Sequence, residues 1–295
     1  MILPQIVLAS RVLLDAHNCY PEQGHWADRI ERALAQGQPI AIEQDLAWFD
    51  GRSILTHEKK FIGSEPGMRR HFFERIRPIV EKELREGDRK RWPVIILNLD
   101  FKSDEPEHHR AVWQLLGEYE AWLTTAVKSA GNPGRLAKLD RKPVMVLTGS
   151  NDAQEQTFFD AVPDGARLRV FGAVTGGAAG TARATNYRRW SNNPWSAVEK
   201  EGQPKAGEWT PADRARLQQL VKEAHRRRLW IRFYTLNGHA PEAAAANGWG
   251  RGYNFGSLEA VRQRWRATID AGVDFVATDQ YEEFARELKG LAISR

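Results

Sequence analysis

Cysteine and long apolar runs are scarce in this sequence. Cys19 is the single cysteine among 295 residues, which excludes an internal disulfide framework and a cysteine-rich zinc site. No apolar run approaches the roughly 20 residues that a transmembrane helix needs. The opening stretch, from Met1 to Gln5, lacks the basic and apolar regions of a secretory signal peptide. The low cysteine content leaves the cellular compartment open.

Two common catalytic motifs are also missing. The glycine-rich run from Gly172 to Gly177 lacks both the G-x-G-x-x-G spacing and the lysine of a P-loop. The segment Gly149-Ser150-Asn151 does not continue into the G-x-S-x-G pattern of a nucleophile elbow. We therefore expect neither a nucleotide-binding loop nor a serine hydrolase.

The composition is that of an ordinary globular protein with a basic bias. Hydrophobic residues make up 42% and charged residues 27% of the chain. The net charge of +5 and a pI near 9.3 favour anionic partners, such as phosphate esters, acidic lipid surfaces or nucleic acid. Eleven tryptophans are present, and both core packing and a substrate cleft are open explanations for them.

Short runs rich in Val, Ile and Leu alternate with amphipathic stretches. Strands are expected at residues 12–14, 40–42, 94–97, 144–147, 168–171, 230–234 and 273–276, with a weaker one at 184–187. Helices are expected at 26–36, 68–86, 109–130, 211–228 and 257–271. Eight strands in 295 residues average about 37 residues per unit, which is typical of a (β/α)8 TIM barrel. The sequence predicts a single α/β domain of this kind over residues 1–295.

Chemically reactive side chains follow three successive expected strands. They are His17 and Asn18 after the first strand, Glu43 and Asp45 after the second with His57 beyond a turn, and Asp100 and Lys102 after the third. Because the active site of such a barrel lies at the carboxyl ends of its strands, we expect these groups at one rim. Polar residues that were placed independently of one another would not cluster at the same rim in three successive βα units.

The carboxylates in this set predict a metal site. Residues two apart on a strand point to the same face, so Glu43 and Asp45 project together, as do Asp100 and Lys102. Adjacent buried carboxylates repel one another unless a cation offsets their charge. The oxygen donors of these three acids, with Asn18, suit a hard divalent cation, Ca²⁺ or Mg²⁺, rather than zinc. Two nearby histidines could move protons, and Lys102 could hold a phosphoryl oxygen.

This arrangement resembles the PLC-like phosphodiesterase superfamily. That group includes calcium-dependent phosphoinositide phospholipases C, glycerophosphodiester phosphodiesterases and sphingomyelinase D-like phospholipases. The resemblance rests on residues 17–20 and 43–45, on His57 and on Asp100. Residues 234–237 and 272–279 are similar to later strands of the glycerophosphodiesterases. The resemblance thus spans the whole expected barrel, although its specific part lies in the first hundred residues.

The resemblance implies metal-dependent cleavage of a phosphodiester, in a phospholipid or its deacylated head group. His17 and His57 would be the catalytic pair, assisted by Lys102. One divalent cation, Ca²⁺ ahead of Mg²⁺, would be bound by Asn18, Glu43, Asp45 and Asp100. Which histidine is the acid stays open, with His57 slightly favoured. So does the choice between a cyclic and a hydrolysed product.

The substrate is not decided, because the residues mix the signatures of different branches. Asn18 matches the phospholipase C branch, whereas Lys102 matches the glycerophosphodiesterase and sphingomyelinase D branches. Asp100 is closer to the sphingomyelinase D branch, in which an aspartate stands where others have glutamate. Candidates for binding the head group are Arg183, Tyr187, Trp190, Tyr234 and Asn237, since arginine suits phosphate and aromatic faces suit choline or sugar.

Two other functions compete with the enzyme. The chain could be a catalytically silent barrel that binds a phosphate-containing ligand or an anionic surface, although simple cation binding needs neither histidine. Basic stretches at 69–70, 89–91 and 226–228 could contact nucleic acid or an anionic membrane. No recognised nucleic-acid motif accompanies them, so no nucleic-acid partner is expected. The resemblance slightly favours a secreted or periplasmic location for a chain whose leader has been removed.

Overall fold

The computed structural model describes residues 12–22, 25–57, 60–132, 134–246 and 251–293. Its backbone contacts divide the chain into two compact units. The histidine unit comprises Met1–His17, Thr175–Arg183 and Trp190–Arg295, and the acidic unit comprises Asn18–Val174 and Ala184–Arg189. No helix among the described residues combines the length and the apolar character that crossing a bilayer requires.

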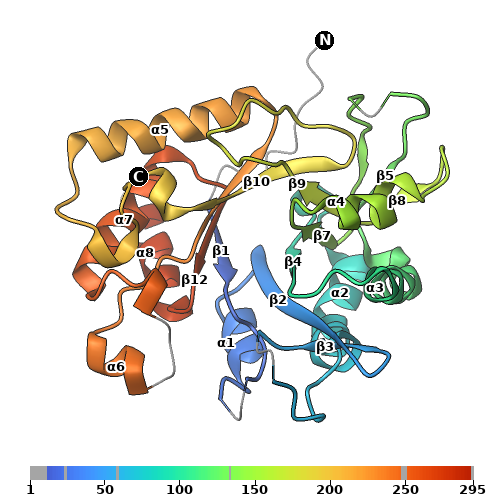
Figure 1. The fold of residues 1–295 in the computed structure, drawn as a ribbon, viewed down its shortest axis with the longest axis horizontal. Coiled ribbons are helices and arrows are strands. Elements are labelled where there is room, and N and C mark those ends of the chain that lie inside the picture. Colours follow the sequence, from blue (N-terminus) through green and yellow to red (C-terminus); the bar gives the residue numbers. More distant parts are fainter. Residues whose placement is uncertain (1–11, 23–24, 58–59, 133, 247–250, 294–295) are drawn as a thin grey trace. The chain divides into compact units, whose positions relative to one another are not determined.

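The histidine unit is built on four parallel strands. Their order is β1 (Leu13–Ala16), β12 (Phe275–Thr278), β11 (Trp230–Tyr234) and β10 (Arg188–Pro194), the last of which begins in the acidic unit. The helices of this unit are α5 (Pro211–Arg226), α6 (Pro241–Ala246), α7 (Leu258–Ala271) and α8 (Tyr281–Ile293). Helix α5 packs against β11 and α7, and α8 packs against β1 (Figure 1). Short helical turns lie at η5 (Trp195–Ala197), η6 (Gln203–Lys205) and η7 (Arg251–Tyr253).

The acidic unit continues the same strand pattern. Its parallel strands are β9 (Phe171–Ala173), β7 (Val144–Thr148), β4 (Ile95–Phe101) and β2 (Ile40–Phe49), and β3 (Arg52–Leu55) pairs antiparallel with β2. Its longer helices are α1 (Arg29–Ala35), α2 (Glu74–Glu86) and α3 (Pro106–Glu118). Shorter segments are η1 (Arg69–Phe73), η2 (Arg89–Arg91), η3 (Glu120–Trp122), α4 (Asp152–Glu155) and η4 (Gln156–Asp160). A three-stranded sheet has the order β6 (Leu139–Asp140), β5 (Thr125–Val127) and β8 (Arg167–Leu168).

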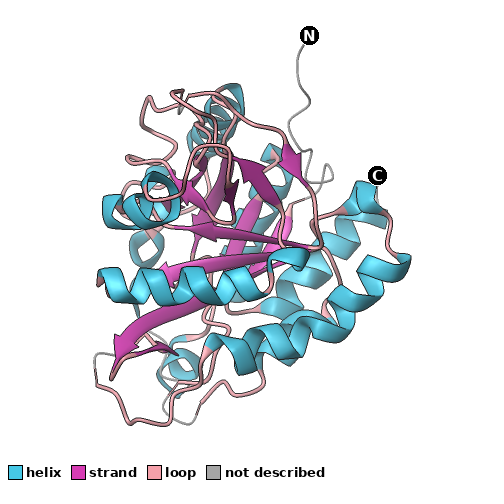
Figure 2. Ribbon diagram, turned by 90° about the vertical axis from the view of Figure 1, so that its right-hand side faces the viewer, coloured by secondary structure: helices cyan, strands magenta, loops and turns pink. Residues whose placement is uncertain are grey.

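These elements have the topology of a (β/α)8 TIM barrel, the fold class that the sequence predicts. Within the described residues, eight parallel strands recur along the chain, and helices follow them except between β9 and β10. Figure 2 shows the strands in magenta and the helices in cyan. That one such domain fills residues 1–295 stays a prediction.

Local sequence signals explain where the helices begin and end. Thr210 caps α5 with its hydroxyl while Asp213 bonds back to the Thr210 backbone, a reciprocal pair that satisfies free N–H groups. Ser257 caps α7, and Gly272 ends that helix with φ of +74°, a conformation that glycine adopts without strain. The strands form because their apolar runs are buried on both faces, as in β7, where every residue is buried.

Several expected boundaries are wrong. Strand β2 runs from Ile40 to Phe49 rather than ending at residue 42, so Glu43 and Asp45 lie within it and not after it. The strand expected at 184–187 lies instead at 188–194, because the buried positions Ser191 and Asn193 of β10 are polar and conceal the strand pattern. The strand expected at 168–171 is split, with Leu168 in β8 and the barrel strand starting at Phe171. The helix expected to reach residue 130 ends at Glu118, because the β-branched stretch that follows forms β5.

The tryptophans mostly contribute to the core. Six of those that the structure describes are buried, namely Trp92, Trp122, Trp190, Trp195, Trp230 and Trp265. Burying an aromatic side chain of this size is one of the largest favourable contributions that a single residue makes to folding. Core packing therefore accounts for at least these six.

Candidate functional sites

The acidic unit brings together three carboxylates. Strands β2 and β4 are neighbours, and their register places Asp45 opposite Asp100. Glu43 lies two residues before Asp45 and projects to the same face of β2. An oxygen from each of these three residues lies within 4.8 Å of an oxygen from the others. We call this group the acidic cluster.

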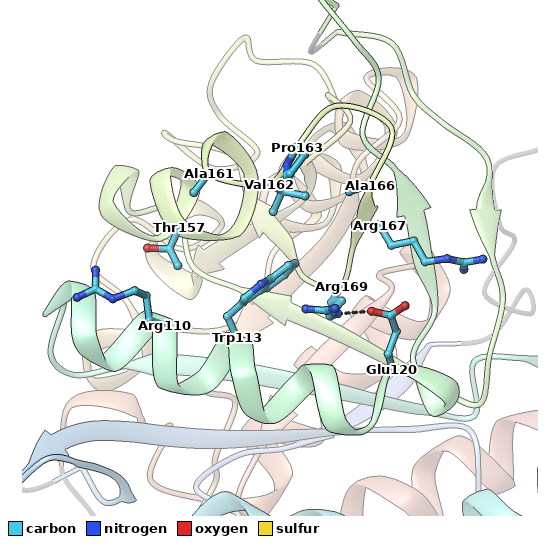
Figure 3. A pocket seen from close by; sticks show the side chains of 10 residues that line it. All are labelled: Arg110, Trp113, Glu120, Thr157, Ala161, Val162, Pro163, Ala166, Arg167 and Arg169. Atoms are coloured by element: carbon cyan, nitrogen blue, oxygen red, sulfur yellow. Dashed lines mark hydrogen bonds and ion pairs between the residues drawn. The ribbon is translucent and has the colours of Figure 1, made fainter.

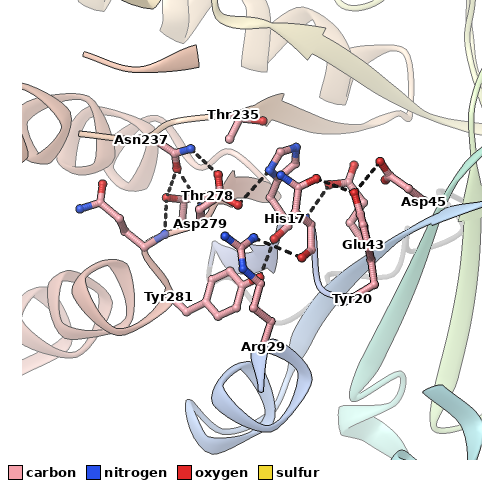
Figure 4. Close-up of polar contacts among 12 residues, drawn as sticks. His17, Tyr20, Arg29, Glu43, Asp45, Thr235, Asn237, Thr278, Asp279 and Tyr281 are labelled. Atoms are coloured by element: carbon pink, nitrogen blue, oxygen red, sulfur yellow. Dashed lines mark hydrogen bonds and ion pairs between the residues drawn. The ribbon is translucent and has the colours of Figure 1, made fainter. Parts of the chain in front are cut away.

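Two further side chains hold Asp45 in place. Lys102 lies with its Nζ 3.0 Å from Oδ2 of Asp45 and 2.7 Å from Oδ2 of Asp100. The buried hydroxyl of Tyr20 lies 2.8 Å from the same Asp45 oxygen and 2.9 Å from Oδ1 of Asn18 (Figure 4). Sequence reasoning missed Tyr20, whose position four residues after a strand carries no distinctive signal.

The electrostatics of the cluster favour a proton or a cation. Burial raises the pKa of Asp45 to about 8, and the neighbouring Asp100 and Glu43 add to the rise while Lys102 opposes it. Burial lowers the pKa of Lys102, but Asp45 and Asp100 outweigh it, so the net pKa is raised. Three ionised carboxylates against one ammonium leave two negative charges, the charge that one divalent cation offsets.

The donor set fits a hard divalent cation. Oδ1 of Asp45 is buried and accepts no hydrogen bond from any described residue, and a buried carboxylate oxygen without a partner is costly. All the donors are oxygens, which suits Ca²⁺ or Mg²⁺. The backbone N–H of Asn18 donates to Oε2 of Glu43 at 3.4 Å, which places Asn18 beside the cluster. Asn18 adopts φ of +51°, which asparagine tolerates better than most residues.

His57 follows β3 and is exposed. Its backbone N–H donates to Oε2 of Glu22 at 2.9 Å, and the hydroxyl of the preceding Thr56 donates to the same carboxylate. These bonds fix the chain at His57, while a catalytic role for its ring stays a prediction.

His17 belongs to a second cluster, within the histidine unit. Its Nδ1 lies 3.2 Å from Oδ1 of Asp279, which follows β12 (Figure 4). Asn237, which follows β11, bonds to the other oxygen of that carboxylate at 2.5 Å. The hydroxyl of Tyr281 donates to the His17 carbonyl oxygen. The resemblance stated in the sequence analysis identified residues 272–279 as similar to a barrel strand but assigned no role to Asp279. An aspartate at the end of a strand commonly has no functional role.

The predicted head-group residues lie in different environments. Arg183 is exposed, and Tyr234 is half-buried beside Tyr253, with ring centroids 6.0 Å apart. Tyr187 and Trp190 are each 1% exposed. Core packing accounts for these two side chains, and substrate binding by any of the five predicted residues stays a prediction.

A separate hollow of about 490 Å³ lies beside α3 (Figure 3). Its lining includes Trp113 and three arginines, and each guanidinium has a carboxylate partner. The pairs are Arg110 with Glu107, Arg167 with Asp140 and Arg169 with Glu120. None of the predicted site residues lines this hollow.

Comparison with known proteins concerns the fold. No protein-family model and no curated protein sequence matches the chain. Similar solved structures include a glycerophosphodiester phosphodiesterase from Parabacteroides distasonis, with 13% identity over 95% of this chain and 98% of that one and a TM-score of 0.52. A calcium-dependent phosphoinositol-specific phospholipase C from Pseudomonas sp. shows 11% identity over 93% and 90%, with a TM-score of 0.42. These names belong to the superfamily that the sequence motifs resemble. At such identities the likeness supports the barrel fold alone.

Proposed function

We propose that the chain is a metal-dependent phosphodiester hydrolase of the PLC-like type. The acidic cluster carries this proposal, since its three carboxylates lie on the neighbouring strands β2 and β4 and one buried oxygen of Asp45 has no hydrogen-bond partner among the described residues. Asn18, Glu43, Asp45 and Asp100 would hold the cation. When bound, it would stabilise the negative charge that develops on a phosphoryl oxygen during cleavage. The similar fold of a glycerophosphodiester phosphodiesterase supports the same class of substrate.

His17 would move the proton. Because the Asp279 carboxylate can only accept a hydrogen bond from Nδ1 of a neutral His17, that nitrogen carries the hydrogen. Nε2 would then be the nitrogen that takes a proton from an attacking hydroxyl. His57 would donate a proton to the leaving oxygen, and Lys102 would contribute a fixed positive charge.

The substrate we propose is a phosphodiester in a phospholipid or in its deacylated head group. Among the five residues predicted to bind the head group, Arg183 and Tyr234 are the proposed contacts, since Tyr187 and Trp190 are buried in the core and the amide of Asn237 is bonded to Asp279. Peripheral contact with an anionic membrane remains a proposal that follows from the basic charge alone.

One experiment tests the function directly. Hydrolysis of bis(p-nitrophenyl) phosphate, phosphatidylinositol, glycerophosphocholine and sphingomyelin is measured with EDTA and after addition of Ca²⁺ or Mg²⁺. We expect turnover that depends on the cation and that falls by roughly 10²- to 10⁴-fold in His17→Ala. His225→Ala, at the exposed end of α5, is the matched control and should retain activity.

Two other outcomes of this experiment would contradict the proposed function. Turnover that EDTA does not change would contradict the metal assignment of Glu43, Asp45 and Asp100. Cation binding without turnover of any of these substrates would favour the silent barrel that binds a phosphate-containing ligand.

A further inference from the structure

We propose that Asn237 is a positioning residue that fixes the Asp279 carboxylate and, through it, the orientation and tautomer of His17. This role deepens the proposed function, on which its catalytic meaning rests. It differs from direct head-group binding, the role that the sequence predicts for Asn237.

Asn237 holds Asp279 through both the side chain and the backbone. Its Nδ2 donates to Oδ2 of Asp279 at 2.5 Å, and its Oδ1 accepts from the Asp279 backbone N–H at 2.8 Å. The same Oδ1 accepts from the hydroxyl of Thr278 at 2.9 Å. Each polar atom of the Asn237 amide therefore already has a partner next to or on Asp279.

The two oxygens of Asp279 have different partners as a result. Oδ2 bonds to Asn237, and Oδ1 lies 3.2 Å from Nδ1 of His17. A carboxylate that is bonded at only one oxygen can rotate about its last torsion, whereas partners on both oxygens select one orientation. Removing Asn237 would remove the hydrogen bond to Oδ2, which is one of the contacts that align the Asp279 carboxylate with His17.

Burial makes this arrangement rigid. Asn237 and Asp279 are each 5% exposed, and Thr278 is fully buried. A carboxylate so far from solvent is stabilised only by the hydrogen bonds that it receives. A hydrogen bond to a charged group contributes more than one between neutral groups, so Nδ2 of Asn237 is an effective clamp.

The backbone around both residues is also tied down. The N–H of Leu236 donates to the carbonyl of Ala277 at 2.7 Å, and the N–H of Phe255 donates to the carbonyl of Asn237 at 2.8 Å. On the other side, the N–H of His17 donates to the carbonyl of Thr278 at 3.2 Å. Backbone hydrogen bonds thus connect the end of β11 to β12 and the end of β1 to β12. Asp279 lies between Asn237 and His17.

The test reads the tautomer of His17 by long-range ¹H–¹⁵N NMR of the full chain with ¹⁵N-labelled histidine. His17→Gln assigns the signal. We expect the Nδ1–H tautomer in the wild type and a loss of at least about half of that preference in Asn237→Ala, because the Asp279 carboxylate then loses the hydrogen bond to its Oδ2. Asn254→Ala is the matched control, since Asn254 lies in the segment that forms a β-bridge with Asn237 and bonds to His239 and Gly256 rather than Asp279.

A His17 signal that is unchanged in Asn237→Ala would overturn the positioning role. If the alanine variant does not fold, Asn237→Ser keeps a small polar group and should give an intermediate tautomer population. A wild-type signal in Asn237→Ser would then overturn the proposal.

Kinetics separate this proposal from the proposed function. A positioning role predicts that Asn237→Ala lowers kcat by about 10- to 100-fold with little change in KM, whereas a head-group contact predicts a higher KM. A higher KM with unchanged kcat would contradict positioning. If the wild type cleaves no phosphodiester while the tautomer shifts as expected, the proposed function fails and the positioning role stands.

Discussion

Asp45 and Asp100 lie directly opposite each other on β2 and β4, although 55 positions separate them in the sequence. Parallel pairing sets this register, so the two carboxylates are adjacent because the strands are. Lys102 contacts both of them, and Glu43 adds a third carboxylate. Like charges this close destabilise the fold unless a cation or a proton offsets them, and this requirement leads to the first prediction.

Asp45→Asn and Glu43→Gln should each weaken the binding of Ca²⁺ or Mg²⁺ on the order of tenfold or more, because each removes a charged oxygen donor. Isothermal titration calorimetry on the purified chain measures the affinity. Glu107→Gln is the control, since Glu107 is exposed and pairs with Arg110 outside the cluster. Equal affinity in Asp45→Asn and in the control would contradict the ligand assignment.

Acid should destabilise the protein through His108. Burial lowers the pKa of His108 to about 4, below its usual 6.5, and nearby His109 adds to the effect. Between these two pH values, His108 binds a proton in the unfolded chain but not in the folded chain. The free energy of unfolding should therefore fall as the pH drops from about 6.5 to about 4, by up to about 3 kcal/mol.

Urea unfolding at several pH values measures this loss, and His108→Gln should flatten the slope. The exposed His25 provides the control, because His25→Gln leaves the buried ring in place. The same slope in His108→Gln as in the wild type would refute this account.

A buried ion pair in the histidine unit should be costly to break. Arg264 donates to both oxygens of Glu199, at 2.9 and 2.7 Å, and Trp195 donates to the same carboxylate at 2.7 Å. Arg264→Met leaves Glu199 buried without its counter-charge, so we expect a loss of about 3–5 kcal/mol in the free energy of unfolding. The exposed pair of Arg226 and Glu223 should contribute about 1 kcal/mol or less.

Chemical denaturation of Arg264→Met and Glu223→Gln compares the buried and the exposed pair. In a double variant, Glu199→Leu with Arg264→Met, much of the loss should be recovered because no unpaired charge remains. A loss in Arg264→Met no larger than in Glu223→Gln would contradict the importance of burial.

Gly172→Ala should reveal how tightly Tyr187 is packed. A Cβ at position 172 would lie 2.5 Å from Cε1 and 2.7 Å from Cζ of Tyr187, closer than carbon atoms approach. The clash should cost about 1–3 kcal/mol, measured by thermal or urea unfolding. Gly207→Ala, where the added carbon meets no atom within 4 Å, is the control. In a Tyr187→Leu background the cost should shrink, and an unchanged cost there would show that another contact is responsible.

Several parts of the fold could be predicted because their signals are local. Apolar runs mark β2, β4, β7, β11 and β12, and each of these strands overlaps the range that the sequence predicts. Strand β10 could not be located, since its buried Ser191 and Asn193 are polar, with Nδ2 of Asn193 donating to the hydroxyl of Ser191. Asn193 also donates to the carbonyl oxygen of Arg232 on the neighbouring strand β11, and the sequence pattern of β10 alone does not reveal this contact.

The acidic cluster shows what the sequence by itself determined. Residues two apart on a strand share a face, so Glu43 was expected to project with Asp45, and successive parallel strands suggested that Asp100 lies beside them. Only the tertiary structure decided which groups these acids contact and which atoms of Asn237 and Asp279 meet. Those contacts join residues 42 positions apart, as in Asn237 and Asp279, or 262 apart, as in His17 and Asp279. Strand periodicity acts over a few residues, whereas contacts at such separations depend on how the strands pair and on the rotamers that burial selects.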